Sequence, residues 1–393
     1  MGSPHVLPDP PRVALIGGGF IGPIHAEALR RIGIPVVGLL GSSPERARPV
    51  ADRLGIARVY RDLEELLGDP EVESVHIASP NRAHYQQAKE ALEAGKHVVC
   101  EKPLATTSSE TADLHARAEA RPGQAAAVHY NIRFYPVCQE IRARIARGDL
   151  GRLLSVTGSY TQDWLLRPED YNWRVEPDGG TNLRAVADIG THWMDLAQFV
   201  TGRPIEMVLA DLATFHTERL RPKGSVETFA GNGGEAGPTE AVPVTTDDHA
   251  AVLLRLADGI RGAFHVSQVT AGRKNRLVLE VAGTEGALAW DSESPDLLWI
   301  GRRGRPNKLL LRDPSLLSPQ ATSHYPGGHA EGFPDTFKYF NLSFYGWIAD
   351  GMPTPCPCPT FEDGHREVLL CEAIARSAAS GGWAVVESAR PEY

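Results

Sequence analysis

The 393-residue sequence predicts an N-terminal α/β domain with a doubly wound parallel sheet, followed by an α+β domain with a large, mostly antiparallel open sheet. Three observations lead to this fold class. Short apolar runs alternate with helical patterns through the first third of the chain. A glycine-rich turn connects the first of these runs to the first helical pattern. Beyond residue 150, apolar and polar residues alternate at the period of half-buried strands.

The first third of the chain is expected to supply five buried strands with helices between most of them. The strands are predicted over residues 12–16, 36–40, 58–60, 72–78 and 97–100. The clearest helices are predicted over 21–32 and 84–92, because each has apolar residues at helical spacing and a glycine after its end. Alternation of this kind produces a parallel sheet, which binds ligands beyond the C-terminal ends of its strands.

The turn from Gly17 to Gly22 has the sequence Gly-Gly-Gly-Phe-Ile-Gly and lies between the first strand and the first helix. Gly17 permits a tight turn, Gly19 leaves room for a pyrophosphate, and Gly22 lets the helix pack closely on the strand. The N-terminus of the helix then offers free N–H groups to the phosphates. A turn without a ligand is the alternative for this motif alone, and the surrounding strand order favours a dinucleotide site.

The end of the second strand bears on the choice between NAD and NADP. It carries no Asp or Glu that would bind a ribose 2′-hydroxyl. Ser42, Ser43 and Arg46 instead offer hydroxyl and guanidinium groups to a 2′-phosphate. The alternative is an ordinary helix start, with Ser43 as the N-cap, Pro44 in the first turn and Arg46 on a solvated face. Both interpretations can hold together, so NAD and NADP stay open.

The fifth strand leads directly into Glu101, Lys102 and Pro103. Two charged residues at the end of a buried strand are costly unless they are used, so we favour a functional role over a local ion pair. Residues 94–105, Ala-Gly-Lys-His-Val-Val-Cys-Glu-Lys-Pro-Leu-Ala, resemble the Glu-Lys-Pro signature of the Gfo/Idh/MocA oxidoreductases, whose N-terminal domain is a Rossmann domain. The resemblance implies that Lys102 lies beside the nicotinamide and touches the substrate hydroxyl, and it points to a cis peptide bond before Pro103.

Tyr130, Asn131 and Arg133 resemble the family's passage at the domain crossover. The resemblance implies that they line the cleft between the domains, although a surface ion pair is an equally favoured role for Arg133. The turn after the fourth strand is expected to touch the nicotinamide half of the cofactor. The cofactor-binding residues expected from the strand ends and from the resemblance are Gly17, Gly19, Phe20, Ile21, Gly22, Ser42, Ser43, Arg46, Ser79, Asn81, His84, Glu101, Lys102 and Asn131.

The second domain is expected to form strands over residues 153–160, 206–215, 250–256, 261–269, 277–281 and 287–290, with a hairpin at Asp258-Gly259. Residues 223–248 are rich in Gly, Thr, Glu and Pro, and we expect a mobile surface insertion there. We place the domains at residues 1–130, 131–360 and 361–393. By the resemblance, the last segment is a helix and tail that pack back towards the first domain.

Asp188, His192 and Asp195 are spaced so that a helix places them on one face. An aspartate one turn before a histidine fixes its tautomer and suits it to accept a hydroxyl proton. From spacing alone, we favour the plainer alternative of a helix N-cap at Asp188 with a core histidine. The tract also resembles the family's motif D-x-G-x-H-x-x-D, which implies that Asp188 and His192 join Lys102 as catalytic residues while Asp195 is structural. No third ligand motif accompanies them, so no metal is expected.

Two loops, at residues 160–182 and 324–333, combine aromatic and polar side chains. Aromatic faces stack on sugar C–H surfaces, and Asn, Asp and Arg bind hydroxyl groups; the alternative is that the tryptophans belong to the core. The loops resemble those of the sugar-oxidising branch that contains levoglucosan dehydrogenase. The substrate-binding residues expected in the chain are Tyr130, Arg133, Trp164, Arg167, Tyr171, Trp173, Arg174, His329 and Glu331.

Composition and charge argue against several classes of protein. The formal net charge is −9, which disfavours a broad nucleic-acid surface. No apolar run is long enough to cross a bilayer, and the N-terminus lacks the pattern of a signal peptide. The five cysteines form no CxxC pair and no zinc spacing, so we expect free thiols in the reducing cytoplasm.

The sequence therefore predicts an NAD(P)-dependent oxidoreductase that moves a hydride between the nicotinamide and a secondary hydroxyl of a sugar, anhydrosugar, glycoside or inositol. The alternative is a redox-assisted glycosidase, which oxidises, eliminates, hydrates and re-reduces its substrate; Arg167 and Arg174 would then hold an anionic sugar substituent. A nucleotide-binding sensor without activity is disfavoured by the joint presence of Lys102, Asp188 and His192. By the resemblance, we expect a homodimer or homotetramer formed through the C-terminal sheet.

Overall fold

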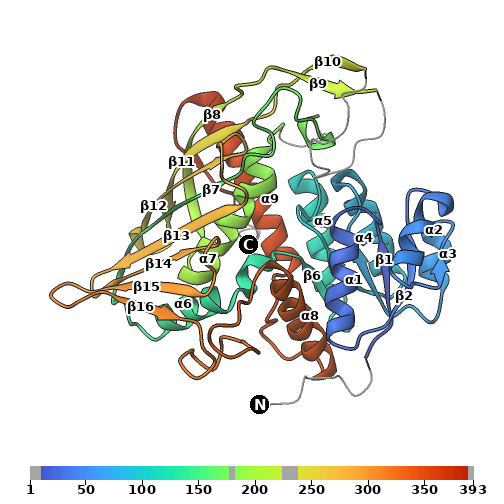
Figure 1. Ribbon diagram of the computed structural model, residues 1–393, viewed down its shortest axis with the longest axis horizontal. Helices are drawn as coiled ribbons and strands as arrows, with labels where there is room; N and C mark the ends of the chain where they lie inside the picture. The colour runs from blue at the N-terminus through green and yellow to red at the C-terminus, as the bar shows by residue number, and fades with distance from the viewer. Residues whose placement is uncertain (1–9, 177–181, 224–237, 388–393) are drawn as a thin grey trace. The chain divides into compact units, whose positions relative to one another are not determined.

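The computed structural model describes residues 10–176, 182–223 and 238–387, which form two compact units (Figure 1). Unit 1 comprises residues 10–134 and 333–368, and unit 2 comprises the described residues of 135–332 and 369–387. The sequence placed residues 333–360 in the second domain, whereas here they belong to unit 1. The difference begins with helix α8 (Phe333–Ala349), which the sequence analysis did not predict.

Unit 1 is built on a six-stranded sheet in the order β3-β2-β1-β4-β5-β6, in which every neighbouring pair is parallel. The strands are β1 (Val13–Ile16), β2 (Val36–Leu40), β3 (Arg58–Val59), β4 (Ser74–Ile77), β5 (His97–Cys100) and β6 (Ala126–Val128). The strand order changes direction between β1 and β4. This confirms the doubly wound parallel sheet, and sheets of this kind bind ligands at the carboxyl ends of the two strands where the order reverses.

The helices of unit 1 cover both faces of its sheet. They are α1 (Ile21–Arg31), α2 (Pro44–Arg53), α3 (Leu63–Gly68), α4 (His84–Glu93), α5 (Ser108–Glu119) and α8, with short 3-10 turns η1 (Asn81–Ala83) and η2 (Asn131–Phe134). One apolar cluster joins Leu15 of β1 to Phe340 of α8, and the other joins Ile16 of β1 to Leu114 of α5. Alternate residues of β1 thus enter opposite clusters, which explains its uninterrupted apolar run.

Unit 2 is built on a nine-stranded sheet in the order β16-β15-β14-β13-β7-β12-β11-β8-β17. Its neighbouring strands are antiparallel except for β7 and β12, which are parallel. The strands are β7 (Leu153–Thr161), β8 (Ile205–Ala213), β11 (His249–Leu256), β12 (Arg261–Ser267), β13 (Arg276–Gly283), β14 (Ala287–Asp291), β15 (Leu297–Gly301), β16 (Lys308–Leu311) and β17 (Ala384–Val385). The predicted mostly antiparallel sheet is confirmed, and β15, β16 and β17 extend it.

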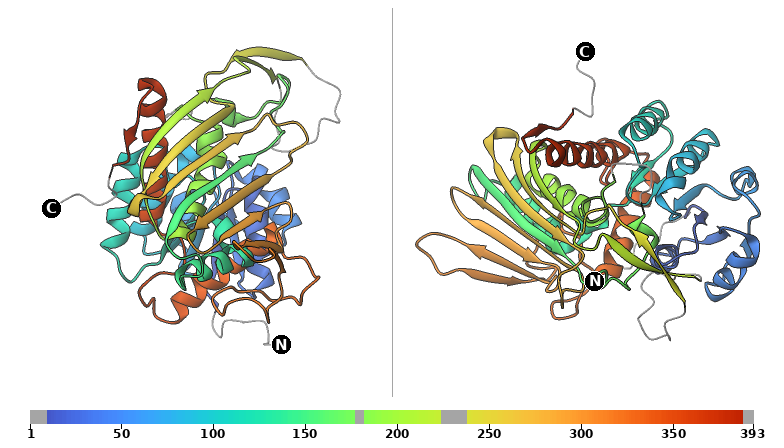
Figure 2. Two further views of the ribbon diagram at one scale, coloured as in Figure 1. Left: turned by 90° about the vertical axis from the view of Figure 1, so that its left-hand side faces the viewer. Right: turned by 90° about the horizontal axis from the view of Figure 1, so that it is seen from above.

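The helices of unit 2 lie against one face of this sheet. They are α6 (Pro136–Ala146), α7 (Thr191–Thr201) and the second half of α9 (Phe361–Ser380), whose first half belongs to unit 1; short turns are η3 (Trp173–Val175), the π-turn η4 (Val186–Gly190) and η5 (Ala257–Gly259). In the described part of the chain, the opposite face carries no covering helix (Figure 2). Strand β11 shows the difference, because Val252 and Leu254 are buried whereas Leu253 between them is 49% exposed.

The expected irregular insertion at residues 223–248 is only partly irregular. Strand β10 (Thr239–Pro243) pairs antiparallel with β9 (Glu218–Pro222), so the prediction is wrong for residues 239–243. This ribbon gave no strand signal because most of the β10 side chains are exposed, and no apolar face alternates along it. Residues 224–237 of the predicted insertion lie outside the described residues.

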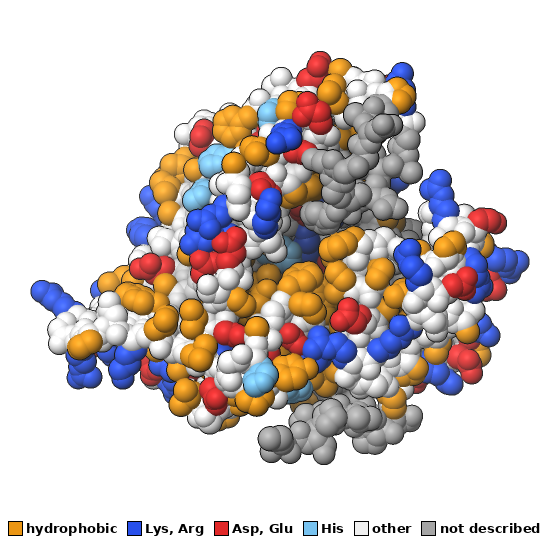
Figure 3. Space-filling model, in the orientation of Figure 1, with side chains coloured by type: hydrophobic (Ala, Val, Ile, Leu, Met, Phe, Trp, Pro, Cys, Tyr) orange, Lys and Arg blue, Asp and Glu red, His pale blue; other side chains and the backbone are white. Residues whose placement is uncertain are grey.

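The five cysteines are free thiols. Among the described helices, none combines the length and the apolar character that a bilayer crossing requires. On the face shown in Figure 3, Lys and Arg side chains lie among Asp and Glu side chains. A basic group stands out at the tip of the β15–β16 hairpin, where Arg302, Arg303 and Arg305 are exposed.

Candidate active site

The glycine turn after β1 has no space for a side chain at two of its positions. Gly17 has a left-handed φ of 112°, and a Cβ there would lie 2.4 Å from the carbonyl oxygen of Ala78. A Cβ on Gly22 would lie 2.1 Å from the carbonyl oxygen of Gly17. Gly19 is exposed, and a Cβ there would meet open space, so its backbone is accessible. This geometry presents the N-terminus of α1 to a phosphate, and a dinucleotide fits it.

The residues beside this turn form two helix starts. Phe20 is 48% exposed, and Ile21 is the first residue of α1. Ser43 caps α2, because its hydroxyl oxygen accepts a hydrogen bond from the backbone N–H of Arg46 at 3.4 Å. The predicted helix cap is therefore confirmed. Ser42 and Arg46 are exposed, so their side chains remain accessible to a ribose phosphate.

His84 links the turn after β4 to the turn after β5. Its Nδ1 lies 2.7 Å from the carbonyl oxygen of Pro103, and its Nε2 lies 2.8 Å from the carbonyl oxygen of Ser79. Burial lowers the pKa of His84, although the two carbonyls act in the opposite sense. The Ser79 hydroxyl donates to Gln87, and Asn81 begins η1. His84 thus holds together two turns at the carboxyl edge of the sheet.

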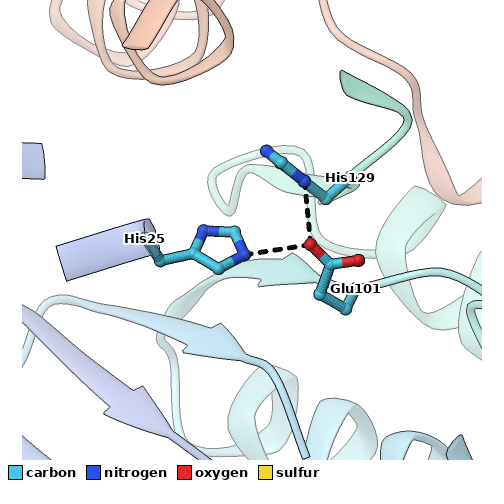
Figure 4. Close-up of side chains that lie close together, drawn as sticks. All are labelled: His25, Glu101 and His129. Atoms are coloured by element: carbon cyan, nitrogen blue, oxygen red, sulfur yellow. Dashed lines mark hydrogen bonds and ion pairs between the residues drawn. The ribbon is translucent and has the colours of Figure 1, made fainter. Parts of the chain in front are cut away.

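Glu101 lies in a buried cluster with two histidines (Figure 4). Its Oε1 is 3.0 Å from Nε2 of His25 on α1 and 2.9 Å from Nδ1 of His129, which follows β6. Its Oε2 accepts a hydrogen bond from the backbone N–H of Lys102 at 3.2 Å. Burial alone would raise the pKa of Glu101, but His129 and His25 lower it well below its ordinary range. The peptide bond between Lys102 and Pro103 is cis, in agreement with the resemblance.

The residues expected to line a cleft at the crossover have partners or are buried within unit 1. Tyr130 is fully buried in an apolar cluster. Asn131 donates from Nδ2 to the hydroxyl of Thr336 at 2.7 Å. Arg133 lies 3.1 Å from Asp363, and its side chain is 12% exposed. Arg133 thus forms an ion pair, but a largely buried one and not the surface pair considered from the sequence.

In unit 2, the predicted catalytic pair lies where a π-turn changes into a helix. Asp188 belongs to η4, whereas His192 and the buried Asp195 belong to α7. The prediction that one regular helix carries all three residues is wrong, because residues 186–190 are wound more widely. Asp188 accepts a hydrogen bond from Nε2 of Gln268 at 2.8 Å, and its Oδ1 lies 3.4 Å from Nε of Arg174.

A buried set of polar groups supports Asp188. The Oε1 of Gln268 accepts a hydrogen bond from Nη1 of Arg184 at 3.2 Å, while its amide nitrogen donates to Asp188. Arg184 and Arg219 both pair with Asp248, and these three side chains are at most 1% exposed. Because Arg184 only donates and Asp188 only accepts, the orientation of the Gln268 amide is fixed.

In the loop after β7, some aromatic side chains pack against apolar residues and one is exposed. Trp164 and Tyr171 pack against a small apolar cluster of Leu165, Val175 and Val244, so the core interpretation holds in part. Trp173 is 37% exposed, and the guanidinium of Arg174 lies 4.5 Å from the centroid of its ring. Arg167 is exposed. Of the predicted substrate-binding residues in this loop, Trp173 and Arg167 are exposed, whereas Trp164, Tyr171 and Arg174 are partly buried.

The second loop predicted to contact substrate is organised around Glu331. This residue is fully buried, and its carboxylate accepts hydrogen bonds from the hydroxyl of Ser323 at 2.7 Å and the backbone N–H of His324 at 2.9 Å. Arg312 lies 3.2 Å from the same carboxylate. We correct the prediction for Glu331, because its carboxylate satisfies groups of its own loop. His329 is exposed, and its contact with substrate stays a prediction.

The structure brings together Glu101, Lys102, His25 and His129 in unit 1, and Asp188 with Arg174 and Gln268 in unit 2. Sequence reasoning missed His25, His129 and Gln268. A signal existed for the two histidines, since His25 lies on the apolar face of its helix between Ile21 and Leu29, and His129 directly follows an apolar run. Gln268 carried no comparable signal.

Two family models match the chain. The model described as an oxidoreductase family with an NAD-binding Rossmann fold matches residues 11–130, and the GFO/IDH/MocA C-terminal domain matches residues 138–289. Levoglucosan dehydrogenase from Pseudarthrobacter phenanthrenivorans is 31% identical over 390 residues, which cover 94% of this chain and 97% of that protein. Myo-inositol 2-dehydrogenase from Thermotoga maritima is 27% identical over 370 residues, which cover 93% and 96%.

The similarity extends to solved structures. The structure of levoglucosan dehydrogenase in complex with NADH and L-sorbose has a TM-score of 0.86 at 30% identity, and the match covers 96% of this chain and 99% of that chain. The glycine turn, the Glu-Lys-Pro tract and the two sheets therefore occur in a chain that is similar to these relatives over nearly its whole length. This chain belongs to the Gfo/Idh/MocA family of NAD-binding oxidoreductases.

Proposed function

We propose that this protein is a dehydrogenase that transfers a hydride from a secondary hydroxyl carbon of a sugar, anhydrosugar, glycoside or inositol to NAD. The observation that carries the proposal is the near full-length similarity to levoglucosan dehydrogenase and myo-inositol 2-dehydrogenase. Both names specify a substrate with hydroxyl groups on a ring. An oxidisable ring hydroxyl is the chemistry that these substrates share.

Three residues handle the hydroxyl group in the proposed reaction. Lys102 hydrogen-bonds the hydroxyl oxygen and polarises it as the carbonyl forms, while His192 accepts the hydroxyl proton. Asp188 orients His192 or the substrate. The bound NAD supplies the acceptor for the hydride, so the protein mainly provides orientation and proton handling.

The proposed reaction can use NAD or NADP as the hydride acceptor. Strand β2 ends without an acidic residue, and Ser42 and Arg46 beside it are exposed. These features support a site that tolerates a 2′-phosphate, so NADP is a second candidate cofactor.

The redox-assisted glycosidase shares the first oxidation step and differs in its outcome. It returns the hydride to the substrate, so each turnover regenerates NAD. Arg167 is the better candidate for holding an anionic sugar substituent, because Arg174 already lies against Asp188.

The experiment is an absorbance screen at about 340 nm with NAD and NADP in parallel, since reduced nicotinamide absorbs there and carries the transferred hydride. The substrates are inositols, free hexoses, anhydrosugars, and neutral and anionic glycosides. We expect absorbance to grow with one class of ring polyol. Release of free sugar from a glycoside in the presence of NAD, without absorbance growth, would instead establish the glycosidase.

We also propose that the protein works in the cytoplasm as a homodimer or homotetramer. The free thiols are suited to a reducing compartment. The uncovered face of the unit 2 sheet, with its exposed Leu253, supports association through that sheet.

A further inference from the structure

A continuous chain of buried hydrogen bonds in unit 1 ends at Glu101. It links the hydroxyls of Ser74 and Tyr345 at 2.9 Å, Tyr345 to Nε2 of His76 at 2.8 Å, Nδ1 of His76 to Nδ1 of His25 at 3.0 Å, and His25 to Glu101 at 3.0 Å. The four residues before Glu101 are at most 1% exposed. The proposed reaction uses none of these four, so their polar groups in the core need another explanation.

The carboxylate fixes the direction of every bond in the chain. An ionised carboxylate only accepts, so His25 carries its proton on Nε2. With one proton on each ring, His25 then accepts on Nδ1 and His76 donates from its own Nδ1. The Nε2 of His76 accepts from the hydroxyl of Tyr345, and Tyr345 accepts from Ser74. Each member therefore has a donor and an acceptor that match its neighbours, and all the donors face towards Glu101.

Both carboxylate oxygens are engaged within unit 1. Oε1 faces His25 and His129, and Oε2 accepts from the backbone N–H of Lys102. We propose that Glu101 is a positioning residue for Lys102, and that the chain from Ser74 to His25 holds its carboxylate in place. This inference rests on the proposed function, in which Lys102 touches the substrate. It replaces the expected direct contact of Glu101 with the cofactor.

A metal ion is the competing explanation for this cluster. Ligand atoms of His25, Glu101 and His129 all lie within 4.8 Å of one another. A metal would need the lone pair of His25 Nε2, which forces the proton to Nδ1 and reverses every donor in the chain. The tautomers of His25 and His76 therefore separate the two explanations.

The first experiment reads those tautomers in the native protein. Nitrogen-15 NMR of the imidazole rings at neutral pH is expected to show the proton of His25 on Nε2 and that of His76 on Nδ1. Protonation of His25 on Nδ1 and of His76 on Nε2, or a metal held in equimolar amount after dialysis, would overturn the proposal. This measurement needs no substrate and no variant.

The second experiment replaces the carboxylate with its neutral isostere. Glu101→Gln is expected to lower kcat by about ten- to hundredfold, because a glutamine amide has one accepting oxygen and cannot accept from both His25 and the peptide of Lys102, so the lysine shifts. The dissociation constant for NAD should stay within about twofold, because Glu101 does not contact the cofactor in this proposal. The control is His97→Gln, since His97 starts the same strand and its Nδ1 only accepts from the backbone of Ala125.

Failure of this inference can be told from failure of the proposed function. Native kcat in a folded Glu101→Gln protein, together with inactive Lys102→Ala, would overturn the positioning role alone. Native turnover in Lys102→Ala would overturn the proposed reaction instead. A Glu101→Gln protein that loses NAD binding in proportion to kcat would contradict the positioning role and restore Glu101 as a cofactor contact. If this variant does not fold, the tautomer measurement still decides.

Discussion

In the proposed mechanism, Lys102 and His192 each contact the reacting hydroxyl. Removal of either side chain should therefore lower turnover and leave cofactor binding unchanged. We predict that Lys102→Ala and His192→Ala each lower kcat/KM by about two to four orders of magnitude. The dissociation constant for NAD, measured by calorimetry, should stay near the native value.

Matched controls exist for both substitutions. Lys274→Ala removes a lysine whose side chain is 81% exposed, and His115→Ala removes a histidine of α5 that lies beside Glu119. Both controls should keep native turnover. Near-native turnover in Lys102→Ala or His192→Ala would remove that residue from the catalytic set.

The sequence could identify residues that belong to a linear motif, but not the residues that hold them. Lys102, Asp188 and His192 were all proposed from short patterns. His25 and His129 approach Glu101 from distant segments, and Gln268 reaches Asp188 from 80 residues away. Such partners are selected by tertiary packing, which a single sequence does not display.

Gln268 is expected to position Asp188, which belongs to the π-turn η4. Gln268 follows β12 and donates to Asp188 across the start of α7. We predict that Gln268→Met lowers kcat by about tenfold or more, because a hydrogen bond to a charged group contributes about 1.5–3 kcal/mol. NAD affinity should not change, because Gln268 is remote in sequence from the glycine turn and lies in the other unit.

A comparison with Gln124→Met checks the specificity of this effect. Gln124 donates to the backbone carbonyls of Leu92 and Lys96 within unit 1. Its loss should lower the melting temperature without a fall in kcat. Equal kinetic losses in the two variants would indicate that Gln268 acts through stability alone.

Regular elements were predictable where burial imposed a clear period. Strands β2 and β5 have the predicted bounds, because their residues form compact apolar runs. Helix α8 was missed, although Phe337, Phe340 and Phe344 follow helical spacing. Strand β16 was missed because it lies at the edge of the sheet, where Leu309 and Leu311 are exposed and no buried face repeats along it; its neighbour β15 was missed as well.

The buried histidines of unit 1 should make the whole molecule sensitive to acid. Burial is the main cause that lowers the pKa values of His76, His84 and His129 below their ordinary value. These rings therefore take up protons less readily in the folded protein than in the unfolded chain, where histidine titrates near pH 6.5. The unfolded state then binds more protons, so stability is present above that pH and is lost as the pH falls.

We predict that the free energy of unfolding falls as the pH drops below about 6.5, by at most about 1.4 kcal/mol per pH unit for each such ring. The measurement is the urea midpoint at a series of pH values between about 8 and 5.5, the interval that brackets the ordinary pKa of histidine. The midpoint should be steady at the upper end and fall steeply at the lower end. A constant midpoint across the series would show that the rings are already protonated in the folded state.

The uncovered sheet face of unit 2 gives a prediction for assembly. Leu253 is 49% exposed at the middle of β11, opposite Leu209 and Ala263 on the neighbouring strands. We predict that Leu253→Asp shifts a dimer or tetramer to monomer, because a charge would be buried in the interface. Light scattering after size exclusion measures the mass. Leu309→Asp, at a position that is 63% exposed on an edge strand, is the control that should leave the mass unchanged.

For the whole molecule, the sequence predicted the two sheets but not which residues belong to each unit. Unit 1 takes residues from both sides of unit 2, and the chain passes between the units at residues 134–135, 332–333 and 368–369. The order of strands and helices along the sequence does not show that residues 333–368 go back to unit 1. The aromatic residues of α8 join the core of unit 1 only because the folded structure brings them there.

Because unit 1 contains residues from before and after unit 2, its parts are synthesised at different times on the ribosome. The first 134 residues emerge with all six strands of the first sheet, yet the apolar face beside β1 and α1 lacks Phe340, Phe344 and Tyr345. Those side chains are not synthesised until the strands β7 to β16 of unit 2 have been made. We therefore expect the apolar face of the nascent first sheet to stay exposed during the translation of about 200 further residues, at about 5–20 residues per second. We therefore expect the N-terminal third to bind chaperones during synthesis, and each unit is built from two separate stretches of the chain.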